Sequence, residues 1–309
     1  MNNSSLIGHL LALTTVVIWG TTFIATKVIL PVFSPLAVLL FRFLLACLLL
    51  LCLRPQALRF RTLREEVGLM GLGLTGVTLY FLFENVALQY TLASNAGLLV
   101  SVSPIITALL AHRFARDERL RAELVWGFVL AISGVFLVMT NGHYVLRLNP
   151  LGDCLALAAA LAWGVYSILL KRAQARYNPV ELACKTFFYG LLWALPSMIW
   201  LPLTVSRLDL ARDWPALVNL AYLGVAASSL CFVMWNGAVR RIGVVKTSNY
   251  IYLVPLITMV TAAVILGERL TPLMLWGGGL ILSGIYVAEH GLRWPAPSPC
   301  DERLGRENG

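Results

Sequence analysis

Three charged residues, Arg42, Glu84 and Lys185, lie inside long apolar stretches of the sequence. A charge near the centre of a bilayer costs about 2.5–3.5 kcal/mol on insertion scales, so each of these residues needs a partner or a function. Arg42 and Glu84 are expected at similar depth, where they would either neutralise each other as an ion pair or form a site. In a site, Arg42 would bind a carboxylate through two hydrogen bonds, and Glu84 would exchange a proton or bind an ammonium group.

Lys185 has two readings as well. It is expected either to contact a bound molecule or a gate, or to extend its flexible side chain to the cytoplasmic surface. Other candidate binding residues are aromatic or carry amides, a combination that suits amphipathic solutes such as amino acids or aromatic cations. Each of them alone is also typical of contacts between helices or of membrane interfaces. These residues are Trp19, Tyr80, Asn85, Asn95, Trp163, Trp235, Asn236, Asn249 and Tyr252.

The composition predicts that these residues lie in membrane-spanning helices. Of the 309 residues, 59% are hydrophobic and 13% are charged, against roughly a quarter charged in an average soluble domain. Apolar spans of about 20 residues recur between short polar segments, as a multi-pass membrane protein requires. The ten predicted crossings are residues 6–26, 35–53, 67–88, 94–111, 124–141, 152–170, 180–201, 216–238, 246–266 and 272–290.

The sequence also repeats itself. Residues 80–104 align with residues 231–255 at an offset of 151, and the segments that follow align at an offset of 150. We therefore predict a first five-helix repeat at residues 1–145, a second at 146–292, and a disordered cytoplasmic tail at 293–309. Because five crossings is an odd number, the two repeats are expected to have inverted topology, related by a pseudo-two-fold axis in the membrane plane.

Two prolines occupy matched positions in the two repeats, and the fifth predicted crossing of each repeat carries a face of small residues four apart. Pro104 and Pro255 are expected to kink their helices, as a bend for gating or as a kink of packing. Small residues predict close helix packing, within the bundle or between two protomers, so the chain is expected to be a monomer or a homodimer. These small residues are Gly127, Ala131, Gly279, Ser283, Gly284 and Ala288.

The basic residues predict the orientation. With the N-terminus in the cytoplasm, 17 of the 24 Lys and Arg residues fall in inside loops and five in outside loops. The positive-inside rule then places both termini in the cytoplasm, in the bacterial inner membrane. The net charge of +9 is explained by topology, and no nucleic-acid partner is predicted. Five of the six cysteines lie in spans and form no Cys-x-x-Cys pair, so no metal site, disulfide or cofactor is expected.

Several runs of the sequence resemble a known family. They are WGTTFIATK, FRFLLA, NVALQYTLASNAGLL with SPIITALLA, and LVPLITMVTAAVILGERLTPLMLWGGGLILSGIYV. Residues 6–290 are thereby similar to the EamA-type branch of the drug/metabolite transporter superfamily. The resemblance implies ten helices, cytoplasmic termini, and a central cavity lined by the first four helices of each repeat, with the fifth and tenth helices at the periphery.

The predicted function is secondary transport. We expect export of small metabolites such as amino acids by alternating access, as a uniport or coupled to protons at Glu84. The alternative is a multidrug antiporter that exchanges lipophilic cations for protons. An intramembrane enzyme is a remote alternative, because the four histidines lie at span ends or in loops and no His-Glu-x-x-His motif is present. The predicted partners are therefore a small-molecule substrate, the lipid bilayer and, for the coupled mechanisms, protons.

Overall fold

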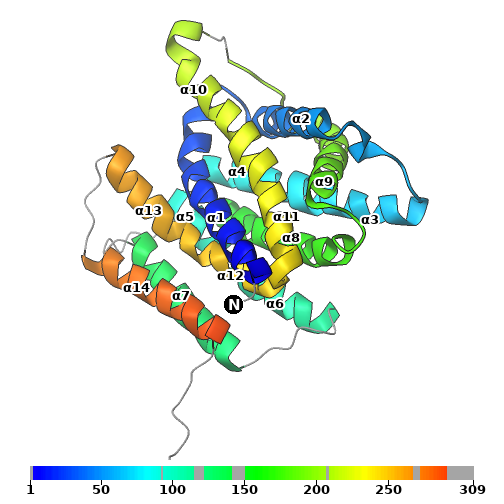
Figure 1. Ribbon diagram of the computed structural model, residues 1–309. Helices are drawn as coiled ribbons and strands as arrows, with labels where there is room; N and C mark the ends of the chain where they lie inside the picture. The colour runs from blue at the N-terminus through cyan, green and yellow to red at the C-terminus, as the bar shows by residue number, and fades with distance from the viewer. Residues whose placement is uncertain are drawn as a thin grey trace, which may run out of the picture.

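The computed structural model describes residues 3–91, 93–114, 122–140, 150–206, 209–266 and 272–290. Within those ranges the protein is a helical bundle (Figure 1). Its elements are α1 (Asn3–Ile29), α2 (Pro35–Leu53), η1 (Pro55–Leu58), α3 (Leu63–Gly73), η2 (Leu74–Leu79), α4 (Tyr80–Tyr90), α5 (Ala93–Val100), α6 (Ser103–Phe114), α7 (Ala122–Thr140), α8 (Pro150–Ala173), α9 (Pro179–Ala194), η3 (Leu195–Ile199), α10 (Leu210–Tyr222), η4 (Leu223–Leu230), α11 (Cys231–Ile242), α12 (Val244–Asn249), η5 (Tyr250–Tyr252), α13 (Leu253–Leu266) and α14 (Pro272–His290). The predicted tail at 293–309 lies outside the described residues.

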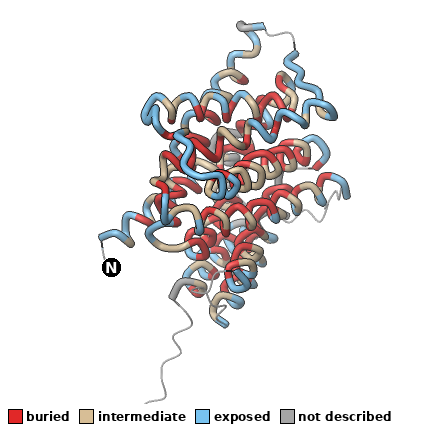
Figure 2. Tube along the Cα trace, turned by 90° about the vertical axis from the view of Figure 1, so that its right-hand side faces the viewer, coloured by how far each residue is buried: buried red, intermediate tan, exposed pale blue. Residues whose placement is uncertain are grey.

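Among the described residues, six helices are long and apolar enough to cross a membrane. They are Asn3–Ile29, Pro35–Leu53, Leu63–Tyr90, Pro150–Ala173, Pro179–Ile199 and Arg212–Ile242, and shorter apolar helices lie at Ala122–Leu137 and Leu275–Ala288. Buried residues run through the centre of the bundle, and many exposed ones on its outside are large and apolar (Figure 2). This distribution fits lipid on the outside, so the chain is an integral membrane protein.

The predicted crossings at 94–111 and 246–266 are each interrupted. A turn at residues 101–102 separates α5 from α6, and the 3₁₀ turn η5 separates α12 from α13. Pro104 and Pro255 follow these interruptions by two and three residues, where the missing proline N–H weakens a regular helix. Helical breaks therefore accompany both prolines, while their role in gating stays a prediction.

The helices that carry two of the three charges begin in the same way. Ser34 caps α2 by accepting a hydrogen bond from the backbone N–H of Ala37, and Asn178 caps α9 by accepting one from Glu181. A proline follows each cap at the first helical position, where its missing N–H costs nothing. These signals end the preceding loops and set where Arg42 and Lys185 stand along their helices.

Matched stretches of π-helix, η2 and η4, lie before α4 and α11. At η2 the wider turn brings the backbone of Gly76 against Tyr166 of α8. A Cβ atom at Gly76 would lie 2.3 Å from the Tyr166 ring, so this approach requires glycine. The π segment therefore sets the distance between the third predicted crossing and α8 beside the cavity.

Helices α7 and α14 lie side by side at the edge of the bundle (Figure 1). A Cβ atom at Gly127 would meet the carbonyl oxygen of Gly284 at 2.7 Å, and one at Gly134 would meet that of Gly277 at 2.5 Å. The small residues thus let two backbones touch. The predicted packing of these faces within the bundle is confirmed for this pair.

Candidate functional site

A central cavity lies between α1, α2, α4, α5, α6, α8, η5 and α13. Its lining residues are Trp19, Thr22, Phe23, Arg42, Tyr80, Phe81, Glu84, Gly97, Val100, Ser101, Ser103, Trp163, Ile251 and Val254. The cavity thus contains both signs of charge, hydroxyl groups and large aromatic rings.

Arg42 is buried, and neighbouring side chains hold its guanidinium in place. Its Nε donates a hydrogen bond to Oγ of Ser228 at 3.0 Å. Its Cζ lies 4.5 Å from the ring centre of Phe81 and 5.1 Å from that of Phe43, in cation–π geometry. Nη1 and Nη2 make no hydrogen bond to any residue that the structure describes. Two donors of Arg42 are therefore available to a bound anionic group.

Glu84 lines the same cavity and is also buried. Its Oε2 atom has no hydrogen-bond partner within the described ranges. Of the two alternatives for Arg42 and Glu84, a direct ion pair is not formed between these described side chains, because no N–O distance of 4.0 Å or less joins them. Arg42 is turned instead towards Ser228 and the two phenyl rings. Two opposite charges thus share one cavity while each keeps hydrogen-bonding capacity.

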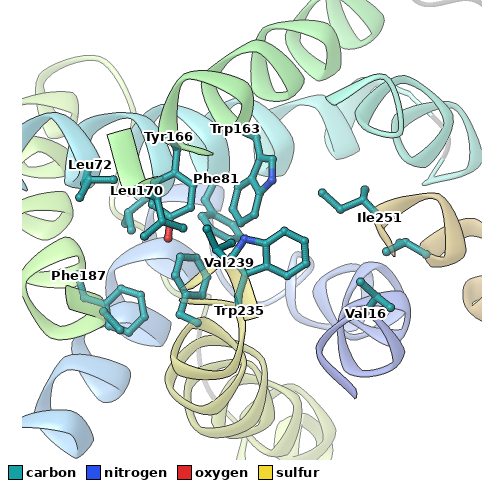
Figure 3. Close-up of a cluster of buried hydrophobic side chains, with 14 of the residues drawn as sticks. Val16, Leu72, Phe81, Trp163, Tyr166, Leu170, Phe187, Trp235, Val239 and Ile251 are labelled. Atoms are coloured by element: carbon teal, nitrogen blue, oxygen red, sulfur yellow. The ribbon is translucent and has the colours of Figure 1, made fainter. Parts of the chain in front are cut away.

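Aromatic rings line and close one side of the cavity. The ring centres of Trp19 and Trp163 are 5.3 Å apart, and Tyr80 lies 5.1 Å from Trp163. Trp235 is not among the lining residues; it packs behind them, 5.0 Å from Trp19. Figure 3 shows the indoles of Trp163 and Trp235 next to each other, near Phe81. Trp19 is fixed by its indole N–H, which donates to the carbonyl oxygen of Ala227 at 2.9 Å.

The predicted asparagines have other positions. Nδ2 of Asn85 donates to the carbonyl oxygen of Pro35 at 3.2 Å, and Nδ2 of Asn236 donates to that of Pro179 at 3.3 Å. Both amides therefore fasten the start of a neighbouring helix and do not line the cavity. Asn249 and Tyr252 are likewise buried outside the lining, and the side chain of Asn95 lies outside the described part of the structure.

Lys185 does not line the cavity, and the prediction that it reaches the cytoplasmic surface is wrong. Its side chain is 1% exposed and forms an ion pair with Glu66 of α3, whose side chain is also 1% exposed. The hydroxyl of Tyr189 donates to the other Glu66 oxygen at 2.5 Å, and the backbone N–H of Arg61 donates to Oε1 at 3.3 Å. Lys185 is buried because this carboxylate compensates its charge.

Two further ion pairs surround this cluster. Arg61 contacts Glu181 at 2.9 Å, and Arg176 contacts Glu65 at 2.8 Å. Burial, and next the Glu65 carboxylate, raise the pKa of Tyr177 to about 12, so its hydroxyl stays protonated at neutral pH. It donates to Oε2 of Glu65 at 3.4 Å.

Sequence reasoning missed several of these residues. Glu66 stands one residue before the predicted start of its crossing, so it was counted with the loop. Ser103 and Ser228 are small hydroxyl residues that are common in membrane helices, so they give little signal. One signal for Ser103 was available, because it precedes the matched proline Pro104. In the described residues, no group of three or more His, Cys, Asp or Glu side chains is arranged to hold a metal ion.

The comparisons with known proteins agree with this architecture. The sequence matches the EamA-like transporter family twice, over residues 6–140 and 150–288. A probable terminal-alkyne amino-acid exporter of Streptantibioticus cattleyicolor is 32% identical over 274 residues, covering 88% of this chain and 90% of that relative. A probable amino-acid metabolite efflux pump of Escherichia coli is 28% identical over 292 residues, covering 92% and 95%. A solved crystal structure superposes with a TM-score of 0.76 at 21% identity, over 94% of this chain and 97% of that chain, which shows a shared fold.

Proposed function

The chain belongs to the EamA-like transporter family, and we propose that it exports small solutes that carry both a carboxylate and an amino group, such as amino acids and their derivatives. One observation carries the proposal. Arg42 and Glu84 line the same cavity, and each keeps unused hydrogen-bonding capacity. The relatives named as amino-acid exporters and efflux pumps support the same substrate class.

The cavity has complementary groups for each part of such a solute. Nη1 and Nη2 of Arg42 form a planar fork that matches a carboxylate in a bidentate pair. The Glu84 carboxylate accepts hydrogen bonds from the ammonium group. Trp19, Trp163 and Tyr80 then cover the side chain of the solute with apolar surface. Both charges of the solute are compensated when it is bound, which lowers the cost of taking it into the membrane.

The proposed mechanism is alternating access between two inverted halves. Support comes from contacts that recur at the repeat offsets: Asn85 bonds Pro35 as Asn236 bonds Pro179. The paired π segments and the two family matches point in the same direction. Exchange of the two halves' conformations would open the cavity to one side of the membrane and then to the other. The distribution of basic residues supports cytoplasmic termini in the inner membrane, and the relatives named as exporters and efflux pumps support transport outward.

A proton-coupled multidrug antiporter is the second candidate. The observation that favours it is Glu84, a buried carboxylate between aromatic rings, which is a setting that attracts lipophilic cations. Arg42 in the same cavity argues against it, because a like charge raises the cost of binding a cation. We therefore rank the zwitterionic substrate first.

A thermal-shift screen of the purified protein in detergent separates the two. The protein is heated with amino acids, amines, sugars or lipophilic cations, because a ligand that binds only the folded state raises its apparent stability. We expect amino acids to raise Tm. Stabilisation by lipophilic cations alone would overturn the proposal in favour of the antiporter.

Glu84→Gln tests whether transport uses a proton. In proteoliposomes with an imposed pH gradient, we expect a coupled carrier with Glu84→Gln to lose gradient-driven transport. Solute exchange between equal concentrations should persist at a reduced rate, because Gln no longer compensates the charge of the ammonium group. For a uniporter, the pH gradient would not change the rate of solute transport in either the wild-type protein or the Glu84→Gln variant. Gln keeps the shape of Glu, so the comparison isolates the ionisable group.

A further inference from the structure

Some buried polar side chains of the bundle have hydrogen-bond partners, and others have none. Most buried polar groups in proteins have a hydrogen-bond partner. Within the described residues, however, the hydroxyls of Thr107 and Ser248 and both amide atoms of Asn249 have none, although all three side chains are buried. We call these three residues the inner polar stripe. Leaving such groups unpaired costs free energy in this conformation, so a second conformation that satisfies them would be favoured.

The inner polar stripe continues the walls of the cavity. Ser103 lines the cavity, and Thr107 lies one turn further along the same face of α6. On the opposite wall Ile251 and Val254 line the cavity at a spacing of three residues, and Ser248 is the next member of that row. Each member of the stripe with a hydroxyl thus extends a row of lining residues by one turn.

Both rows extend towards the same end of the bundle. Helix α6 packs against α12, whereas α5 packs against α13, so the two segments run antiparallel. One turn forward on α6 and one turn back on α12 therefore lead in the same direction. That direction is towards the start of α1, since Tyr250 contacts His9 at 2.8 Å, whereas Thr258 bonds the later Gly20 at 2.6 Å. The predicted topology places this end at the cytoplasm.

The backbone at the same place is irregular. The 3₁₀ turn η5 follows Asn249 directly, and the turn at residues 101–102 precedes Ser103. Non-helical backbone at membrane depth is tolerated where it is buried in protein or lines a water-filled path. Transporters place such interruptions at their solute sites. This observation is independent of the unpaired side chains.

We infer that the inner polar stripe lines the cytoplasmic half of the solute path, which is closed in this conformation. It forms a second binding site that opens when access to the cavity switches to the cytoplasmic side. Its hydroxyls and amide offer hydrogen bonds without charge. It therefore suits the polar groups of a zwitterionic solute and its accompanying water, and not a lone ion. The inference rests on the proposed transport function. It adds to that function the residues that an exported solute contacts first, before it reaches Arg42 and Glu84.

Apolar substitutions test the inference. Thr107→Val and Ser248→Ala remove an unpaired hydroxyl with little change of shape. We expect each to raise Tm by about 2 °C or more and to slow solute efflux from proteoliposomes about 2- to 10-fold, the worth of one hydrogen bond. Thr247→Val is the matched control, because Thr247 is buried on the same helix and its hydroxyl already donates to Gly243 at 2.7 Å. It should neither raise Tm nor slow efflux.

Two results would overturn the inference. If Tm rises and efflux is unchanged, the stripe is only a packing defect; if Tm does not rise, its groups are paired in solution. Labelling provides a readout that needs no known substrate. In a cysteine-free background, Ser248→Cys should react with a charged methanethiosulfonate reagent about 10-fold faster than Thr247→Cys. The reason is that residue 248 would line a water-filled path, whereas residue 247 is packed within protein. Equal labelling rates of the two cysteine variants would reject the inner polar stripe as part of the path, even if the wild-type protein transports solute. If the labelling rates differ but no solute in the thermal-shift screen raises Tm, only the proposed substrate class is rejected.

Discussion

In the described part of the bundle, the buried charges Arg42 and Glu84 differ from the buried charges Lys185 and Glu66 in how their hydrogen bonds are satisfied. Arg42 and Glu84 share a cavity without an ion pair, each with hydrogen-bonding capacity left. Lys185 and Glu66 are paired and buried, and Tyr189 completes the hydrogen bonds of the carboxylate. Membrane burial alone therefore does not identify a binding charge. A charge whose bonds are made within the protein holds helices together, while a charge with free donors or acceptors in a cavity can bind a solute.

The largest expected effect comes from breaking the buried pair. Lys185→Met leaves the Glu66 carboxylate without its cation, which typically costs about 3–5 kcal/mol of stability. We expect a large drop in Tm of the purified protein. The double variant Lys185→Met/Glu66→Leu should recover most of it, because removing both charges also removes the cost of burying them. A double variant as unstable as the single one would show that the pair does more than balance charge.

The next effect concerns the cavity charge. Arg42→Ala removes the proposed carboxylate partner, and a charge-assisted hydrogen bond is worth about 1.5–3 kcal/mol, so solute efflux should fall about 10- to 100-fold. The loss of stability should be smaller than for Lys185→Met, since Arg42 donates only one hydrogen bond within the described residues. Efflux assays and melting curves on the same preparations measure both. If Arg42→Ala unfolds the protein and Lys185→Met only impairs efflux, the assignment of the two pairs is reversed.

Arg42→Lys sharpens this measurement. It keeps the positive charge and loses the planar fork that binds a carboxylate in a bidentate way. Intermediate efflux is expected. Full activity of Arg42→Lys would mean that charge alone is needed, and would weaken the case for a carboxylate.

The smallest expected effects test whether the two predicted repeats hold the helices of Arg42 and Lys185 by equivalent hydrogen bonds. Asn85 and Asn236 each donate one hydrogen bond to the proline that begins the helix of Arg42 or Lys185. Replacing either by Leu should lower stability by about 1 kcal/mol, the typical net value of one hydrogen bond. Similar melting shifts for Asn85→Leu and Asn236→Leu are expected. A shift in only one of them would show that the two halves hold these helices by different means.

Much of this architecture could be predicted from the sequence. Hydropathy indicated the membrane helices, and faces of small residues predicted the packing that α7 and α14 adopt. The internal offsets led to Asn85 and Asn236, whose equivalent bonds the structure contains. The prediction of ten crossings is met in part, since the described residues contain six long apolar helices and shorter apolar ones. The repeat boundaries and the inverted topology stay predictions.

The predictions failed where partners had to be chosen between helices. Similar depth along the sequence leaves Arg42 and Glu84 either as an ion pair or as a site, because depth does not say which side of a helix a residue faces. The sequence does not reveal the partner of Lys185, because Glu66 is 119 residues away and falls just before the predicted crossing that starts at residue 67.

The sequence by itself determined that the chain crosses a membrane and that Arg42, Glu84 and Lys185 lie within its apolar helices, because hydropathy and helical period depend on local residue order. Only the tertiary structure decided which charge is satisfied and which one faces the cavity. That choice depends on the rotation and spacing of helices that are distant along the chain, and these follow from packing that local residue order does not specify.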